Sequence, residues 1–177
     1  MKDIKFSRVW AMPNADTFSI KPIGEFVCKY LRESKVSVDP FSRNKEWATY
    51  TNDLNPNTSA KEHMDAEDFL RKYTNIAPDL VIFDPPYSPG QMSEVYSGVG
   101  LKRDGAGGRN GELYKRVRDA IRDMAVDSTT VLSFGWNSCG MGKGWEITEL
   151  MLVAHGGAHN DTICMAERRL PRESLLI

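Results

Sequence analysis

The chain has 177 residues, of which 41% are hydrophobic and 27% charged, and its formal net charge at pH 7 is −1. This length suits one domain with a hydrophobic core and is hardly enough for two. The near-neutral charge excludes a global basic field, so any contact with nucleic acid needs a local patch of basic residues.

The three cysteines, Cys28, Cys139 and Cys164, are widely spaced and form no Cys-x-x-Cys or Cys/His ligand pattern. We therefore predict neither a disulfide framework nor a metal site. The N-terminal stretch MKDIKFSRVW lacks an apolar signal core, and no run approaches the ~18 apolar residues of a membrane span. These features indicate a cytoplasmic protein with no membrane partner.

The chain begins with a segment, residues 1–16, that we expect to be irregular because it contains turn-forming residues. Residues 21–34 carry apolar side chains at helical spacing, and Pro22 stands at the helix entry. A short strand is predicted over 35–41, where alternating residues stop at a proline.

The middle of the chain continues this alternation of strands and helices. Residues 47–58 begin with β-branched and aromatic residues and end in Asn, Asp and Pro, which indicates a strand followed by a loop. Residues 65–73 have acidic residues early and basic residues late, as the helix dipole favours. The apolar run 80–83 is the clearest strand.

The C-terminal half starts with residues 88–111, a long Gly- and Arg-rich loop of the kind that covers or binds ligands. A helix with a basic face is predicted over 111–125, and a strand over 129–136. Residues 144–157 and 161–169 are two further strands joined by a Gly-Gly turn, which indicates an antiparallel hairpin.

Asp84-Pro85-Pro86-Tyr87 follows directly after the apolar strand, and the two prolines end it because they cannot donate ladder hydrogen bonds. A carboxylate and a fixed carbonyl that accept both N–H bonds of a ring amino group would localise its lone pair for attack on an electrophile. The tyrosine ring offers a face for a base removed from its stack. The alternative is a purely structural role, in which Asp-Pro forms a turn and the tyrosine covers the core.

This tetrapeptide after an apolar strand resembles motif IV of the S-adenosylmethionine-dependent amino-methyltransferases, above all the short N6-adenine DNA methyltransferases of phages and prophages. The order of the upstream segments FSIKPIGEFV, VSVDPF, TNDLNP and HMDAEDFL is similar to that of the family. The resemblance spans about residues 17–169. It implies a Rossmann-like α/β methyltransferase fold, with a mostly parallel sheet and a C-terminal antiparallel hairpin, in a bacterial or phage-infected cell.

The resemblance also implies residue roles. The catalytic residues would be Asp84, Pro85, Pro86 and Tyr87. The S-adenosylmethionine site would comprise Phe18, Lys21, Pro22, Asp39, Pro40, Phe41, Asp53 and Asp65. Methyl transfer is direct in this family, so no metal is needed.

Two features depart from the family pattern. The segment after Asp39-Pro40-Phe41 has no glycine until Gly90, and the span from Asp39 to Thr49 is too short for an ordinary crossover helix. The first βα unit is therefore abbreviated, or the strand assignment is wrong. Arg43 and Asn44 either bind the cofactor carboxylate or cap a turn.

The chain has no room for a separate target-recognition domain, so substrate contact would fall to the long loop and the basic helix. A cluster of basic side chains there would contact phosphates or simply form a solvated face. These residues are Lys102, Arg103, Arg109, Lys115, Arg116, Arg118 and Arg122.

The sequence thus predicts a methyltransferase acting on an exocyclic amino nitrogen, with adenine N6 in DNA as the first acceptor and a homo-oligomer as a possible assembly. The alternatives are an RNA, nucleotide or protein-amide acceptor, or a protein of this fold that binds or depletes S-adenosylmethionine without methylating nucleic acid.

Overall fold

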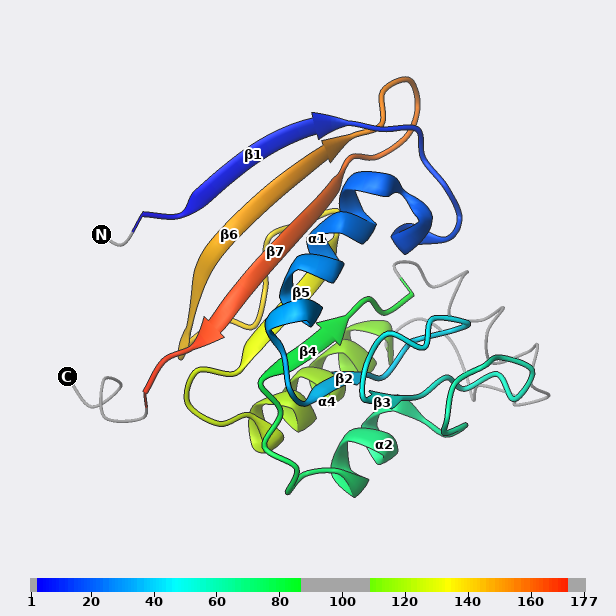
Figure 1. Cartoon of the computed structure of the whole chain (residues 1–177), viewed down its shortest axis with the longest axis vertical. Helices are drawn as coiled ribbons and strands as arrows, with labels where there is room; N and C mark the ends of the chain where they lie inside the picture. The colour runs from blue at the N-terminus through cyan, green and yellow to red at the C-terminus, as the bar shows by residue number, and fades with distance from the viewer. Residues whose placement is uncertain (1–2, 87–108, 172–177) are drawn as a thin grey trace.

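The computed structural model describes residues 3–86 and 109–171, which form one seven-stranded sheet in the order β1-β6-β7-β5-β4-β2-β3 (Figure 1). The expected loop over 88–111 lies outside the described residues except at its end. The strands are β1 (Lys5–Trp10), β2 (Ser37–Asp39), β3 (Tyr50–Thr51), β4 (Leu80–Phe83), β5 (Thr130–Gly135), β6 (Trp145–Ala154) and β7 (Thr162–Arg169).

The sheet is mostly parallel, as predicted. Strands β2, β3, β4 and β5 run parallel to one another, and β1 runs parallel to β6. Only β7 is antiparallel to its neighbours, because it returns from β6 through a tight turn and inserts between β6 and β5. The predicted antiparallel hairpin is therefore confirmed.

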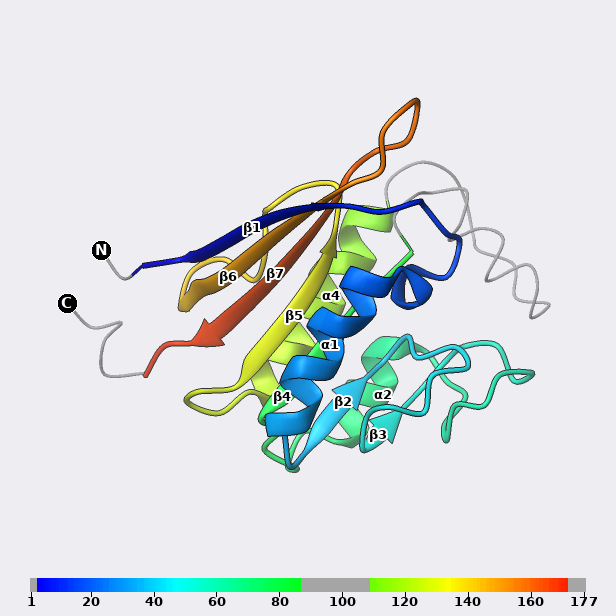
Figure 2. The same cartoon turned by 45° about the horizontal axis from the view of Figure 1, so that its top comes forward.

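Helices cover both faces of the sheet (Figure 2). Helix α1 (Lys21–Glu33) lies on one face, and its residues Ile23, Phe26 and Val27 are buried there. Helices α2 (Ala66–Lys72) and α4 (Arg109–Met124) pack on the opposite face. Within the described parts of the chain, no helix has the length and apolar character needed to cross a membrane.

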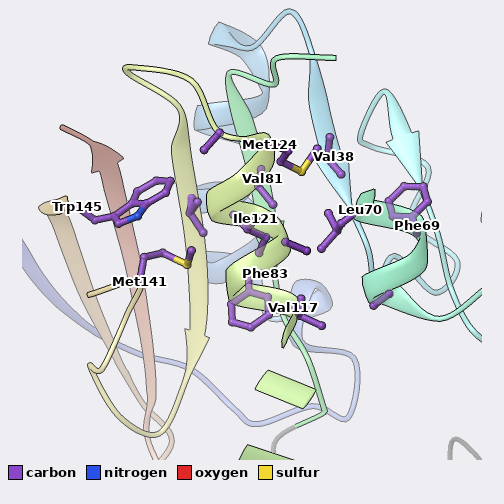
Figure 3. Close-up of a cluster of buried hydrophobic side chains, with 14 of the residues drawn as sticks. Val38, Phe69, Leu70, Val81, Phe83, Val117, Ile121, Met124, Met141 and Trp145 are labelled. Atoms are coloured by element: carbon purple, nitrogen blue, oxygen red, sulfur yellow. The ribbon is translucent and has the colours of Figure 1, made fainter. Parts of the chain in front are cut away.

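The core between the sheet and helices α2 and α4 is made by residues that the helical and strand periods place inward (Figure 3). Phe69 and Leu70 of α2 and Ile121 of α4 are fully buried against Val38 and Val81 of the sheet. All four residues of β4 are buried, as expected for a central parallel strand covered on both faces.

The first βα unit is abbreviated, as predicted from its length. Residues 40–49 connect β2 to β3 through turns and contain no helix. Among the described residues, the sheet continues beyond β3 as a single bridge between Asn52 and Glu62. The edge of the sheet on this side is therefore made of loops.

The prediction of an irregular segment over residues 1–16 is wrong for residues 5–10, which form β1, while residues 11–16 contain no helix or strand. This strand pairs with β6 along its whole length, from Lys5 opposite Glu149 to Trp10 opposite Ala154. Lys5 makes an ion pair of 3.3 Å with Glu149, whose carboxylate also binds Lys29 and Tyr30 of α1. A buried acidic residue on β6 thus ties the N-terminal strand to the helix.

The loop between β5 and β6 is fixed by a second buried acid. Glu167 of β7 is 3% exposed, and its carboxylate accepts a hydrogen bond of 2.9 Å from the amide of Met141. Arg118 and Arg122 of α4 donate to the carbonyls of Gly140 and Met141 from the other side. The loop is therefore clamped between α4 and the sheet.

Replacing Gly140 by alanine should be costly because its φ is +51° and a Cβ would overlap the Glu167 carboxylate. Gly157 has a similar φ of +61° but no atom within 4 Å of its Cβ position. We expect Gly157→Ala to lower the free energy of unfolding by about 1 kcal/mol and Gly140→Ala by about 3 kcal/mol, measured by urea denaturation. Equal losses would show that Glu167 moves aside freely.

Candidate active site

The carboxyl ends of β2, β3 and β4 open into a cleft of about 940 Å³, as expected for a parallel sheet. Residues that follow β2 and β3 line one part of the cleft, among them Phe41, Arg43 and Asp53, and we call this part the polar end after its charged side chains. The other end lies against Trp136 and the β6–β7 turn. Asp84, at the end of β4, also lines the cleft.

The Asp-Pro-Pro turn is positioned by both the sheet and helix α4. Asp84 is half-buried, Pro85 is buried, and both line the cleft together with Pro86. The hydroxyl of Tyr114 donates a hydrogen bond to the carbonyl of Pro86. Tyr87 lies outside the described residues, so its predicted role stays a prediction.

Tyr114 is a site residue that the sequence analysis missed. Its ring packs edge-on against Phe83, with 6.3 Å between the ring centroids. Burial and the charge of Asp84 raise the pKa of its hydroxyl to about 12, so it remains a hydrogen-bond donor at neutral pH. In sequence it is one apolar position of an amphipathic helix, and only the packing of α4 shows which group it contacts.

Asp39 lies beneath the cleft and is 2% exposed. Its carboxyl accepts a hydrogen bond of 3.0 Å from the amide of Phe41, two residues further on. Burial, followed by the charges of Asp84 and Asp53, raises its pKa to about 8 although the Phe41 amide acts in the opposite direction. Three predicted site carboxyls therefore lie close enough to influence one another.

The two other predicted acidic residues line the polar end of the cleft. Asp53 accepts hydrogen bonds from the amides of Arg43 and Asn55, at 3.1 and 2.8 Å. Asp65 caps the N-terminus of α2 by accepting from the amide of Glu67 at 2.9 Å. Both side chains are half-buried, so their carboxylates are fixed by backbone amides and still reach the cleft.

The loop after β2 replaces the missing glycines in an unusual way. Arg43 adopts a φ of +50°, a conformation that normally favours glycine. The amides of Phe41, Ser42 and Arg43 are bonded within the protein, to Asp39, Asn52 and Asp53 respectively. The Arg43 guanidinium donates to the carbonyl of Ala15 at 3.1 Å and lines the cleft.

The remaining residues predicted for the cofactor site divide into three groups. Pro40 and Phe41 line the cleft. Phe18 is 7% exposed, stacks on Trp47 and borders a smaller adjoining hollow of about 120 Å³. Lys21 and Pro22 form the first turn of α1 and do not line the cleft, and the Lys21 side chain is 85% exposed.

The opposite end of the cleft carries a half-exposed aromatic residue. Trp136 is 50% exposed at the end of β5 and lines the cleft, whereas Trp145 is buried in the core. His155 is buried and both of its ring nitrogens are engaged, with Ala11 O and Thr162 Oγ1, each at 2.9 Å. His155 therefore supports the wall of the cleft from within the protein.

Among the described basic side chains of this segment, Arg116, Arg118 and Arg122 make contacts within the protein. Arg116 makes an ion pair of 3.2 Å with Glu67 of α2, and Lys115 is exposed. Lys102, Arg103 and the side chain of Arg109 lie outside the described residues. Within the described part of the chain, no group of three or more His, Cys, Asp or Glu side chains could hold a metal ion.

Comparison with known proteins identifies the fold. No family model and no curated protein sequence matches the chain. The structure is similar to that of Escherichia coli yhhF, which carries a provisional assignment as a methyltransferase, with a TM-score of 0.54 and 11% identity over 91% of this chain and 92% of that one. The fold is methyltransferase-like.

Two further structures share this fold. TrmN from Thermus thermophilus matches with a TM-score of 0.56 and 12% identity over 84% of this chain, which spans 48% of TrmN. The N-methyltransferase NodS from Bradyrhizobium japonicum WM9 matches with a TM-score of 0.52 and 10% identity over 85% of this chain and 98% of NodS. At such identities the methyltransferase-like fold is established, and the chemistry must be argued from the site.

The pKa of Asp39 predicts a pH dependence of stability. Between its ordinary value of 3.8 and the folded value of about 8, the unfolded chain is ionised at this position while the folded protein holds a proton. The contribution of Asp39 to the free energy of unfolding therefore falls as the pH rises from about 4 to about 8. We expect Asp39→Asn, which keeps an acceptor for the Phe41 amide, to remove this fall.

The free energy of unfolding of Asp39→Asn should be close to that of the wild type near pH 4. Near pH 8 it should be higher than that of the wild type by at least about 1 kcal/mol. Urea denaturation of both proteins across this window provides the measurement. A difference that stays constant with pH would show that Asp39 is ionised in the folded protein throughout.

Proposed function

We propose that this protein transfers a methyl group from S-adenosylmethionine to an exocyclic amino nitrogen, and that adenine N6 in DNA is the first acceptor to test. The observation that carries the proposal is the position of Asp84. Asp84 directly follows the central parallel strand β4, and its side chain lines the cleft. The cleft extends from the polar end, which suits a nucleoside, to the end beside Trp136. The methyltransferase-like fold supports the same reading.

The acceptor amino group would donate its hydrogens to the Asp84 carboxylate and the Pro85 carbonyl. These two acceptors draw the nitrogen lone pair out of the ring as charge develops on the nitrogen, which stabilises the transition state. Tyr114 holds the turn from the side of α4, through the Pro86 carbonyl. The turn therefore presents its acceptors in a fixed direction, with little reorganisation during the reaction.

The residues at the polar end fit the cofactor. Asp53 would accept from the ribose hydroxyls and Asp65 from the amino group of the adenine ring. Because the loop amides are already bonded within the protein, the cofactor's carboxylate would pair with the Arg43 guanidinium. Bound there, S-adenosylmethionine supplies an electrophilic methyl group on a positively charged sulfur.

The aromatic end of the cleft suits a planar acceptor. Trp136 is half-exposed beside the cleft, and a ring in this position can stack a base removed from its helix. Phosphate contacts would come from Lys102, Arg103, Arg109 and Lys115. Arg116 is less suited to this role because it already pairs with Glu67.

A second candidate function is binding of S-adenosylmethionine without methyl transfer. The observation that favours it is the loop after β2, whose internally bonded amides leave the cofactor's methionine part to side chains alone. Incubation of the protein with labelled cofactor and DNA, RNA, free nucleotides or Gln- and Asn-containing peptides separates the two functions. Label in an amino nitrogen of DNA is expected, and bound but untransferred cofactor supports the alternative.

Asp84→Asn should abolish transfer while leaving cofactor binding nearly intact. The substituted amide has one acceptor oxygen in place of two and carries no negative charge to stabilise the positive charge that develops on the nitrogen. We therefore expect turnover to fall by about 10²–10³-fold. Asp68→Asn, at an exposed position on α2, is the matched control and should retain full activity. Retention of activity in Asp84→Asn would exclude the proposed role of this carboxylate.

Asp53→Asn tests the polar end separately. Loss of a carboxylate that accepts from two ribose hydroxyls should weaken binding of S-adenosylmethionine and of its demethylated product alike, by about 10-fold or more. Calorimetric titration of both ligands measures this. A loss confined to the charged, methylated ligand would mean that Asp53 faces the sulfonium rather than the ribose.

A further inference from the structure

An apolar stripe is exposed along β1, far from the core. Phe6 and Trp10 are 65% and 63% exposed, and Arg8 lies between them on the same face of the strand. Ile4 and Met12 flank the strand and are 51% and 68% exposed. These five positions alternate along the chain, so one face of β1 presents large side chains to solvent.

The opposite face of β1 is partly covered, since Ser7 and Val9 are half-buried while Lys5 stays exposed. Lys5 pairs with Glu149, and Val9 packs against the core beneath α1. The helices on the exposed side, α2 and α4, pack over the other half of the sheet and not over β1 (Figures 1 and 2). The stripe therefore has no cover among the described residues.

β1 is also an edge strand. It pairs with β6 on one side and with no described strand on the other (Figure 1). Its free edge contains no proline and no bulge between Lys5 and Trp10, which are common devices for blocking edge-to-edge association. The combination of aromatic residues, Met and Arg is also the composition enriched in protein–protein interfaces.

We propose that β1 pairs antiparallel with β1 of a second copy of this chain, about a two-fold axis through Arg8. The stripe is palindromic in residue type, because an aliphatic or thioether chain, an aromatic ring and the central arginine occur in the same order from either end. Across the axis, Ile4 faces the partner's Met12 and Phe6 faces the partner's Trp10. Such self-complementarity is what a two-fold interface requires.

The available area is sufficient for a weak specific dimer. Phe and Trp side chains each bury up to about 200 Å² when fully covered, and here nearly two thirds of each is exposed. Edge-to-edge pairing covers the flanks of these rings and leaves their outer faces in solvent, so with the strand edge the interface would bury at most about 1,000 Å² in total, the lower limit for a specific association. The two opposed arginines limit its strength, although each guanidinium can contact the partner's aromatic rings.

Antiparallel pairing places the two clefts at opposite edges of one continuous sheet. No residue of β1 lines the cleft among the described residues, so this proposal does not depend on the proposed function. Loss of the dimer should leave ligand binding unchanged, and the two hypotheses can fail separately.

Sedimentation of the full chain over about a hundredfold concentration range is the first test. We expect a monomer–dimer equilibrium, and Phe6→Ser should raise its dissociation constant at least about tenfold. Val126→Ser removes another exposed apolar side chain, 43% exposed after α4, and should change nothing. A monomer at every concentration, or equal effects of both variants, would overturn the proposal.

The second test locates the axis. Arg8→Glu places two like charges at the two-fold, as the wild type does, but a mixture of wild type and variant places opposite charges there. Native mass spectrometry of the mixture should show heterodimer above the statistical proportion. Lys35→Glu, at an exposed site before β2, should give the statistical proportion. The same proportion for Arg8→Glu would exclude an axis at residue 8.

Discussion

The parallel pairing of β2, β4 and β5 is the constraint on which the cleft depends. Because these strands are parallel and adjacent, whatever follows each of them emerges at the same edge of the sheet. β4 is buried on both faces, so its register is fixed by packing, and Asp84 follows its last residue directly. The prolines then prevent the chain from continuing the ladder, and Tyr114 fixes the direction in which it leaves.

This arrangement concentrates acidic groups. Asp39 ends β2, Asp53 and Asp84 follow β3 and β4, and after burial the charges of Asp84 and Asp53 contribute to the raised pKa of Asp39. Backbone amides satisfy Asp39 and Asp53, which allows these carboxyls to persist near one another. A ligand that carries a positive charge into the cleft would relieve the repulsion. The electrostatics are therefore consistent with a sulfonium cofactor, and they disfavour an anionic ligand close to Asp84.

Much of the scaffold could be predicted because its signals are local. The strand before Asp84 is a continuous apolar run, and the helix at Lys21–Glu33 has both a proline entry and a regular apolar face. β1 was missed because its large apolar side chains, such as Trp10, point to solvent, whereas a half-buried strand is recognised by apolar residues that point to the core. Tyr114 and Trp136 were missed for another reason: each depends on how a helix or strand end is placed, which local sequence does not specify. Trp136 and Trp145 both lie near glycines at strand ends, yet only the first reaches the cleft.

The central claim is that the polar end of the cleft holds S-adenosylmethionine. Ultraviolet crosslinking of the wild-type protein with radiolabelled cofactor, followed by peptide mapping, tests both binding and its location. The account predicts label in peptides that contain the loop after β2 or the segment from Asp53 to Asp65, and competition by the demethylated product. Absence of label, or label confined to peptides outside the cleft, would contradict it.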